Sequence, residues 1–360
     1  MKIEILSRSV ILERETPLHS YAAWPSVTRL PNGALAMVTS GFRLNHICPF
    51  GKCVISYSYD EGKSWTLPAP VIDTLLDDRD GGIAVFGEND VIVTSFNNTV
   101  EFQRDMAGRT SVAHCAGKHR DYVNAYLDVL ERDHDWRADL GSTFRISHDG
   151  GYTFGPVGKI PVSCPHGPAA LPDGTLLYVG RRFSADNSFR EGENNLASYK
   201  LYADGHYEYL GEIEDLPGMM FCEPHTVVLP DGTVLVHIRG ERNFTILQCE
   251  SYDGGRTFTK AHALLPDRGG APAHILLDGD TLISTYGYRD APYGIRAMFS
   301  TDGGKNWLTD QIIIDDCIDW DLGYPASVVL KDGSILTVYY AKRAKTSPSV
   351  IMQVIWRYEL

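Results

Sequence analysis

The chain has 360 residues and a formal net charge of -13, with 43% hydrophobic and 22% charged residues. This acidic balance argues against nucleic acid or an anionic membrane as a partner, because both need clustered Lys and Arg to displace counterions. With 34 Gly, 19 Pro and 19 Tyr, the composition favours an all-β protein that is rich in turns.

Cysteine usage and the start of the chain bear on the compartment. The seven cysteines are an odd number and form no Cys-x-x-Cys pair, so we expect free thiols and no bound metal or cofactor. Met1 leads directly into a polar, alternating segment, and no apolar run is long enough to span a membrane. We therefore expect a cytoplasmic protein, unless a secretion signal was removed from a longer chain.

Along the chain, the predicted elements repeat one unit, in which an apolar strand closes on a tight turn and re-enters as a second strand. The six copies occupy residues 24–33, 80–89, 166–174, 223–232, 271–279 and 324–333. They begin roughly 50 to 90 residues apart, which is about the length of a four-stranded propeller blade with variable loops. Six copies therefore predict six blades.

A second repeat, Ser-x-Asp-x-Gly-x-x-aromatic, follows in several units. Full matches lie at residues 58–65, 147–154, 251–258 and 300–307, and a degenerate copy lies at 202–209. Its Asp can accept backbone N–H bonds across a hairpin, its Gly can adopt a left-handed conformation, and its aromatic side chain can pack between sheets. We therefore assign these Asp-box turns to the scaffold and not to catalysis.

The last unit has no such turn, and its outer strands are expected at residues 349–358 and 2–12. Pairing the two ends of the chain would close the ring without a free sheet edge. The sequence thus predicts one domain over residues 1–360, a six-bladed β-propeller with four-stranded antiparallel blades. Residues 97–141 look inserted into blade two, and helical spacing within 120–132 predicts an amphipathic helix that either packs on the body or covers the site.

Function is expected where the inner strands converge at one mouth of the channel. Counting back eight positions from the turn residue of each unit aligns Trp24, Glu223 and Tyr324, and brings Asp80 near the same point. Two carboxylates and a tyrosine are therefore the candidate reactive groups.

Arginines and histidines are expected to surround these groups. Four arginines follow the turns by eight or eleven positions, namely Arg181, Arg239, Arg289 and Arg43. Their planar guanidinium groups suit a carboxylate on the ligand. Three histidines, His166, His225 and His274, begin inner strands. Because their positions relative to the turn differ by blade, we favour hydrogen bonding to sugar hydroxyls over metal ligation.

The Asp boxes and the axial residues together resemble the sialidase superfamily of six-bladed propellers over nearly the whole chain. The resemblance implies that Tyr324 is the nucleophile, that Glu223 activates it, and that Arg239 is one of three arginines that bind the substrate carboxylate. A sialoside carries a carboxylate at its anomeric carbon, so a neutral phenol approaches that carbon better than a charged carboxylate would.

Two features depart from the sialidase pattern. The segment expected to carry the first arginine reads Ala22-Ala23-Trp24-Pro25, and the expected acidic Asp is absent from residues 39–50. We expect Asp80 to supply the acid from another blade, and Arg43 or Arg289 to complete an altered carboxylate clamp.

These features predict a glycoside hydrolase of the sialidase-like class that cleaves a terminal, acidic sugar from a glycan. Two alternatives stay open. A polysaccharide lyase would abstract the proton beside a uronate carboxylate with His or Tyr, and its product would absorb in the ultraviolet. A glycan-binding propeller would bind sugar without cleaving it.

Overall fold

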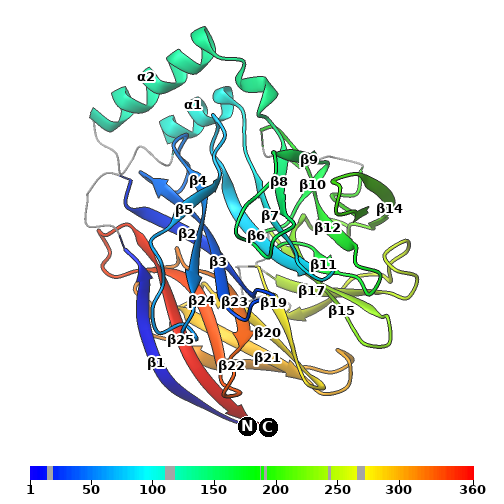
Figure 1. Cartoon of the computed structure of the whole chain (residues 1–360). Coiled ribbons are helices and arrows are strands. Elements are labelled where there is room, and N and C mark those ends of the chain that lie inside the picture. The colour runs from blue at the N-terminus through cyan, green and yellow to red at the C-terminus, as the bar shows by residue number, and fades with distance from the viewer. Residues whose placement is uncertain (14–18, 110–117, 187, 190–192, 242–244, 266–271) are drawn as a thin grey trace.

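The computed structural model describes the chain except for residues 14–18, 110–117, 187, 190–192, 242–244 and 266–271. The described residues form six antiparallel sheets, which are arranged as the blades of a six-bladed β-propeller (Figure 1). The first strands of neighbouring blades contact one another around the axis. The predicted fold class is therefore confirmed.

In each blade the strands follow one another outward from the axis. Blade one contains β2 (Tyr21–Arg29), β3 (Leu35–Arg43), β4 (Lys52–Ser58) and β5 (Ala69–Ile72), and blade two contains β6 (Arg79–Phe86), β7 (Asp90–Phe96), β8 (Ser142–Ser147) and β9 (Gly158–Ile160). Blade four contains β15 (Phe221–Val228), β16 (Val234–Gly240), β17 (Thr245–Ser251) and β18 (His262–Leu265), and blade five contains β19 (His274–Asp278), β20 (Thr281–Tyr288), β21 (Gly294–Ser300) and β22 (Leu308–Ile314).

Blade three differs from the others at its inner strand, which is split into two short pieces. Both β10 (Val162–Ser163) and β11 (Ala169–Ala170) pair with β12 (Leu176–Arg182), and β13 (Leu196–Leu201) and β14 (Tyr207–Ile213) complete the sheet. The interrupted stretch between the two pieces contains His166 and Gly167.

Blade six joins the two ends of the chain. It contains β23 (Gly323–Val329), β24 (Ile335–Lys342), β25 (Ser349–Glu359) and β1 (Lys2–Leu12). The outermost strand β1 pairs with β25 in antiparallel register, and the two termini lie side by side in Figure 1. The predicted pairing of the chain ends is confirmed.

The Ser-x-Asp-x-Gly turns join the third and fourth strands of blades one, two, four and five. In each, the Ser hydroxyl accepts the N–H of the Gly, as from Gly62 to Ser58 at 2.8 Å, and the Asp accepts the N–H four residues on, as from Thr257 to Asp253 at 2.9 Å. Blade six lacks this turn because its third and fourth strands come from opposite ends of the chain.

The hydrophobic core lies between neighbouring blades. Phe144 of blade two packs with Tyr178 of blade three, and Phe299 of blade five packs with Trp356 of blade six. The aromatic residues of the turns add to this layer, since Trp307 donates its ring N–H to Gln248 of the preceding blade at 2.8 Å. Each blade therefore buries one face of its neighbour.

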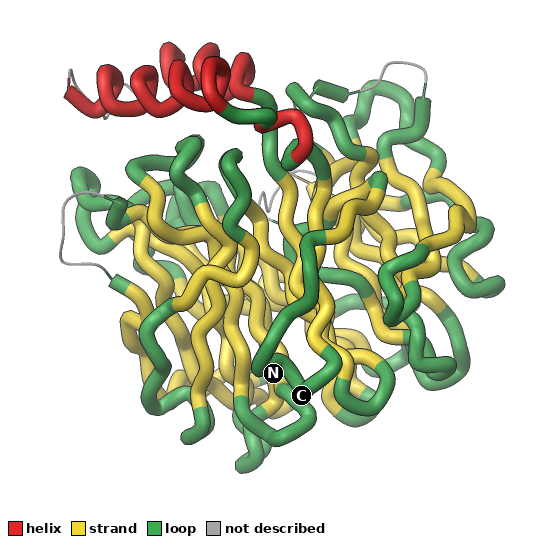
Figure 2. The backbone as a smooth tube through the Cα atoms, turned by 45° about the horizontal axis from the view of Figure 1, so that its top comes forward, coloured by secondary structure: helices red, strands yellow, loops and turns green. Residues whose placement is uncertain are grey.

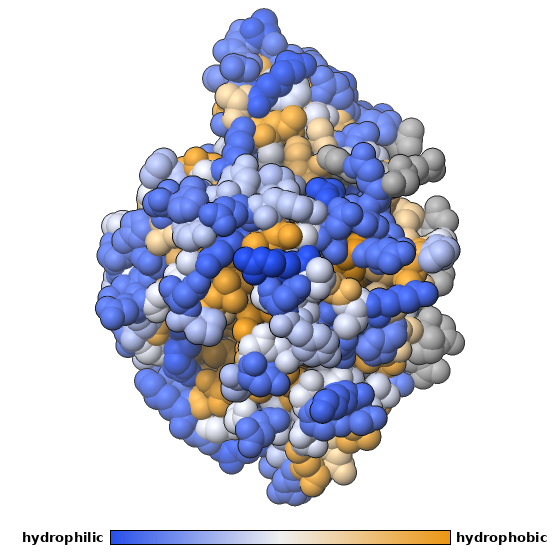
Figure 3. Space-filling model, turned by 90° about the vertical axis from the view of Figure 1, so that its right-hand side faces the viewer, coloured by the Kyte–Doolittle hydropathy of each residue, from blue (hydrophilic) through white to orange (hydrophobic). Residues whose placement is uncertain are grey.

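The segment between β7 and β8 carries α1 (Val100–Arg109), α2 (Lys118–Asp133) and a short 3-10 helix, η1 (Trp136–Ala138). The helix predicted at 120–132 is confirmed as α2, whose Val123, Leu127 and Leu130 pack with Leu76. Figure 2 shows α1 and α2 over one end of the propeller, and Figure 3 shows this part protruding with a mainly hydrophilic surface.

Two further observations concern the whole chain. Among the described residues, no helix combines the length and the apolar composition that a membrane crossing requires. Six of the seven cysteines are described and each is a free thiol, whereas Cys115 lies outside the described residues.

Candidate active site

Four inner strands carry the same backbone irregularity at the mouth of the channel. Trp24, Asp80, Glu223 and Tyr324 have positive φ angles of 55°, 52°, 47° and 48°. In each case the strand pairing shifts at this residue, as between Arg79 and Gly82 and between Gly323 and Ala326. A left-handed residue in a bulge is strained, and such strain is concentrated at functional sites.

Tyr324 and Glu223 form the centre of this group. The Tyr324 hydroxyl donates a hydrogen bond of 2.6 Å to Glu223 Oε1, and Arg239 Nη1 donates one of 2.5 Å to Glu223 Oε2. Burial and the Glu223 charge hold the pKa of Tyr324 well above its usual value. Burial raises the pKa of Glu223, but Arg239 and the Tyr324 hydrogen bond outweigh it and lower the net pKa. The pair is therefore a neutral phenol beside an ionised carboxylate.

Asp80 faces the same centre from blade two. Its backbone N–H donates to Ser40 Oγ at 3.0 Å, and its Oδ1 is buried without a hydrogen-bond partner among the described residues. Burial raises the pKa of Asp80 to about 7, against the lowering effect of Arg79. A carboxyl group with such a pKa can be protonated near neutral pH and can serve as a general acid.

These residues line a pocket of about 410 Å³. Its described lining includes five arginines but only three carboxyl groups, so the pocket is locally basic in a protein of net charge -13. The lining residues that carry charge are Arg79, Arg181, Arg182, Arg239, Arg289, Asp80, Glu223 and Glu241. Among the described residues, none of those that line the pocket comes from α1 or α2.

Three of the four predicted arginines line the pocket. Arg239 pairs with Glu223 and with Glu241 Oε2 at 2.8 Å, while Arg289 Nη2 donates to the Leu322 carbonyl and to the Tyr340 hydroxyl. Arg181 donates to the Ser188 carbonyl and stacks on Phe189.

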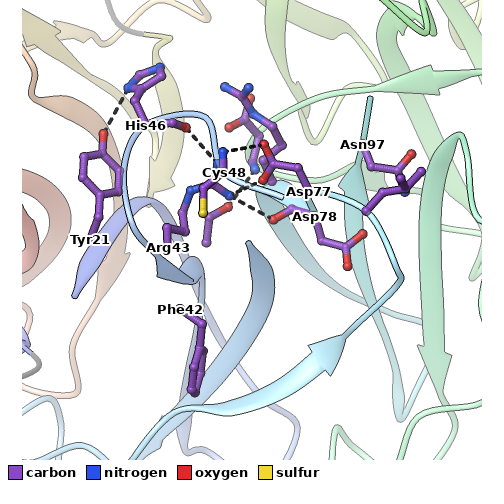
Figure 4. Close-up of polar contacts among 12 residues, drawn as sticks. Tyr21, Phe42, Arg43, His46, Cys48, Asp77, Asp78 and Asn97 are labelled. Carbon is purple, nitrogen blue, oxygen red and sulfur yellow. Dashed lines mark hydrogen bonds and ion pairs between the residues drawn. The ribbon is translucent and has the colours of Figure 1, made fainter. Parts of the chain in front are cut away.

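The fourth, Arg43, is not brought to the pocket. It is fully buried behind Trp24 and pairs with the equally buried Asp77 at 2.6 Å (Figure 4). The main-chain oxygen of His46 accepts a further hydrogen bond from Arg43 at 2.8 Å. This side chain holds the loop after β3 in place and leaves no donor for a ligand, so the structure corrects the expectation that Arg43 binds substrate.

The three predicted histidines pack against one another and are not among the described residues that line the pocket; His166 and His225 are buried, and His274 is partly buried. Their ring centroids are 4.4 to 5.6 Å apart. His225 Nδ1 accepts the N–H of Ile275 at 2.9 Å and His274 Nδ1 accepts that of Ser327 at 3.3 Å, so both rings are neutral with the proton on Nε2. Burial lowers the pKa of all three histidines. Their position beneath the pocket corrects the expectation that they contact sugar hydroxyls.

Sequence reasoning missed several pocket residues. Arg79 lies directly before Asp80 in β6, and its guanidinium is packed between the rings of Trp24 at 4.9 Å and Phe96 at 5.6 Å. Trp320 lies in the loop before β23 and exposes 57% of its surface at the pocket edge. The sequence shows that Arg79 and Asp80 are adjacent, but the side chains of adjacent strand residues point to opposite faces. The bulge in β6 is needed to bring both side chains to one pocket.

His46, in the loop after β3, was also missed. Its Nδ1 lies 3.0 Å from the Tyr21 hydroxyl and 3.6 Å from Asp321 Oδ1. Burial lowers the pKa of His46, although Asp321 opposes the effect. No periodicity marks a loop residue of this kind, so only the folded chain reveals its place at the pocket.

Comparison with known proteins supports the fold of this chain. No family model matches it, and a search of curated proteins finds no match. Among solved structures, a protein of unknown function from Dyadobacter fermentans is similar with a TM-score of 0.75 and 21% identity, over 99% of both chains.

Sialidases are also among the similar structures. The Trypanosoma rangeli sialidase has a TM-score of 0.63 and 15% identity, over 97% of this chain but 59% of its own. The NanB sialidase from Streptococcus pneumoniae has a TM-score of 0.63 and 12% identity, over 97% of this chain and 70% of its own. At these identities the likeness shows a sialidase-like propeller fold and does not carry the activity with it.

Proposed function

We propose that the protein is a glycoside hydrolase of the sialidase-like class, which removes a terminal, acidic sugar from a glycan. The observation that carries the proposal is the hydrogen bond of 2.6 Å between the Tyr324 hydroxyl and Glu223 at the pocket. A tyrosine whose proton is held by an adjacent carboxylate has the arrangement of an activated nucleophile.

In the proposed reaction, Tyr324 Oη attacks the anomeric carbon while Glu223 takes the phenol proton. Asp80 gives its proton to the glycosidic oxygen, which leaves with the electron pair of the broken C–O bond. Water then displaces the tyrosine, with Asp80 as the base and Glu223 returning the proton to the phenol. Asp80 suits the first step because burial keeps its carboxyl protonated to a higher pH than usual.

The substrate class rests on the charge of the pocket. A pocket with more arginines than carboxyl groups, in a strongly acidic protein, favours an anionic sugar. The release assay must identify the sugar, because the buried Trp24 stands where the resemblance leads one to expect an arginine.

The test is a release assay on aryl glycosides, with the sialoside beside the glucuronide, rhamnoside and arabinofuranoside. We expect turnover of an acidic glycoside, and we expect Tyr324→Phe and Glu223→Ala each to reduce kcat by about 10²–10⁴-fold. Equal turnover by wild type and Tyr324→Phe would remove the tyrosine from the mechanism.

A uronate-containing oligosaccharide added to the panel separates the two alternatives, because a lyase needs a leaving group at C4 that a simple aryl glycoside lacks. A product of this oligosaccharide with a new double bond that absorbs in the ultraviolet would indicate a lyase, and binding of the sugars without cleavage would indicate a glycan-binding protein. In either case the pocket would retain its ligand class while the proposed chemistry would fail.

A further inference from the structure

Arg79 differs from the other pocket arginines in its partners. It is 7% exposed and lines the pocket, yet its guanidinium forms no ion pair or hydrogen bond with any described residue. Its planar group is held between the Trp24 and Phe96 rings, which fix its position without satisfying its donors. Because a buried cation without a partner is costly, this set of donors is suited to binding an anionic group.

The other pocket arginines have protein partners that neutralise or hold them. Arg239 lies between two glutamates, and Arg182 pairs with Glu212 at 2.6 Å. Arg289 and Arg181 donate to main-chain carbonyls. Arg79 is therefore the pocket arginine whose charge and donors are best placed to meet an anionic group of a ligand.

The position of Arg79 also affects the neighbouring acid. Asp80 follows it directly in β6, and the two side chains face one pocket without a hydrogen bond between them. The charged or titratable groups that act on Asp80 are Arg79, Arg43, Glu223, Asp77 and Tyr324. Among them, Arg79 most strongly favours the ionised form of Asp80.

We propose that Arg79 binds the anionic group of the sugar, and that the bound anion, by offsetting the charge of Arg79, holds Asp80 in its protonated form. This inference rests on the proposed function for the role of Asp80 as the general acid. It adds that binding of an acidic substrate keeps Asp80 protonated, and therefore able to act as that acid. A neutral sugar would leave the Arg79 charge uncompensated, and Asp80 would lose its proton at lower pH.

Isothermal titration calorimetry measures ligand binding and the accompanying proton uptake without requiring turnover. Glucuronate and N-acetylneuraminate are titrated into the protein at pH 7.5, in two buffers of different ionisation enthalpy, with glucose as the neutral counterpart of glucuronate. We expect at least one acid to bind with uptake of about half a proton per ligand, because the pKa of Asp80 starts at about 7 and rises on binding. Glucose should take up none.

Three variants separate the roles. Arg79→Gln should weaken binding of the acid at least about 10-fold and abolish proton uptake, since one charge-assisted contact is lost. Asp80→Asn should bind the acid but take up no proton. Arg79→Lys keeps the charge and covers the case in which the glutamine variant does not fold. Arg29→Gln is the control, and it should behave as wild type because Arg29 is paired with Glu61 at 2.8 Å and does not line the pocket.

Failure of both acids to bind, equal binding by Arg79→Gln, or binding without proton uptake would each overturn the inference. Turnover of an acidic glycoside together with no proton uptake would reject the inference and leave the hydrolase standing. Proton uptake without turnover would support the Arg79 site and reject the hydrolase.

Discussion

At the scale of single residues, the pocket combines a neutral nucleophile with an ionised partner. The Tyr324 phenol keeps its proton because burial and the Glu223 charge both disfavour a phenolate. Glu223 stays ionised because Arg239 compensates its burial. Neither side chain would hold this state alone, so we expect the two to act as a unit.

A double-mutant cycle tests that expectation. Tyr324→Phe and Glu223→Gln each remove one partner of the 2.6 Å hydrogen bond and should each lower kcat by about 10²–10⁴-fold. The double variant should be no slower than the slower single variant, because the second substitution removes a partner that has already lost its function. Additive losses in kcat, measured on the same aryl glycoside, would show that the two residues act independently. Thermal unfolding of each variant controls for loss of structure.

At the scale of elements, inner-strand bulges and the loop after β3 shape the pocket. Trp24, Glu223 and Tyr324 each precede a proline, which disfavours the right-handed helical region for the preceding residue, and all three have positive φ angles at a bulge. The loop after β3 depends on the buried pair of Arg43 and Asp77. This loop places His46 at the pocket, so the buried ion pair affects the pocket by holding the loop in position.

Gly51 provides a test of that loop. A Cβ at Gly51 would overlap the Arg43 guanidinium and the Asp77 carboxylate, so Gly51→Ala should break the buried pair. We expect a loss of about 3–5 kcal/mol in the free energy of unfolding, as measured with urea. Gly232→Ala is the control, because it has a positive φ but nothing within 4 Å, and it should cost about 1–2 kcal/mol of backbone strain alone. Equal losses in the two variants would exclude a special role for the pair.

At the scale of the whole molecule, buried titratable groups couple the stability of the propeller to pH. Burial lowers the pKa of His274 to about 4 and of His237 to about 3, and it also lowers those of His166, His225 and His46. Below pH 6.5 these histidines are protonated in the unfolded chain but stay neutral in the folded chain. They therefore lower the free energy of unfolding as the pH falls. Asp78 and Asp80 act in the opposite direction, because burial raises the pKa of each to about 7.

The five histidines outnumber the two aspartates, so we expect the free energy of unfolding to decrease from pH 6.5 to pH 4.5. Urea unfolding at several pH values measures this slope. The double variant His225→Gln/His274→Gln should have a shallower slope than wild type, whatever its stability at pH 7. A slope that is unchanged in the double variant would show that these histidines can be protonated within the folded protein.

The sequence by itself determined the number of blades, the closing of the ring by the chain ends and the alignment of Trp24, Glu223 and Tyr324. These features follow from local patterns, namely strand periodicity, turn residues and a constant distance from turn to bulge. The assignment of the Asp-box carboxylates to their own turns also agrees with their hydrogen bonds, because that motif is local.

Only the tertiary structure decided which charged side chains share the pocket. Arg43 and Arg289 lie at the same distance from their turns, yet Arg43 pairs with Asp77 from the loop between blades one and two, and Arg289 reaches the pocket. Of the three histidines only His274 begins an inner strand, whereas His225 lies within β15 and His166 lies between β10 and β11, and the three rings pack together instead of lining the pocket. Arg79 reaches the pocket because of the bulge in β6, and His46 reaches it from the loop after β3. Contacts between residues that are far apart in the chain determine which charged side chains lie in the pocket. The reason is that the free energy of a buried charge depends on its neighbours in space and not on its position in a sequence repeat.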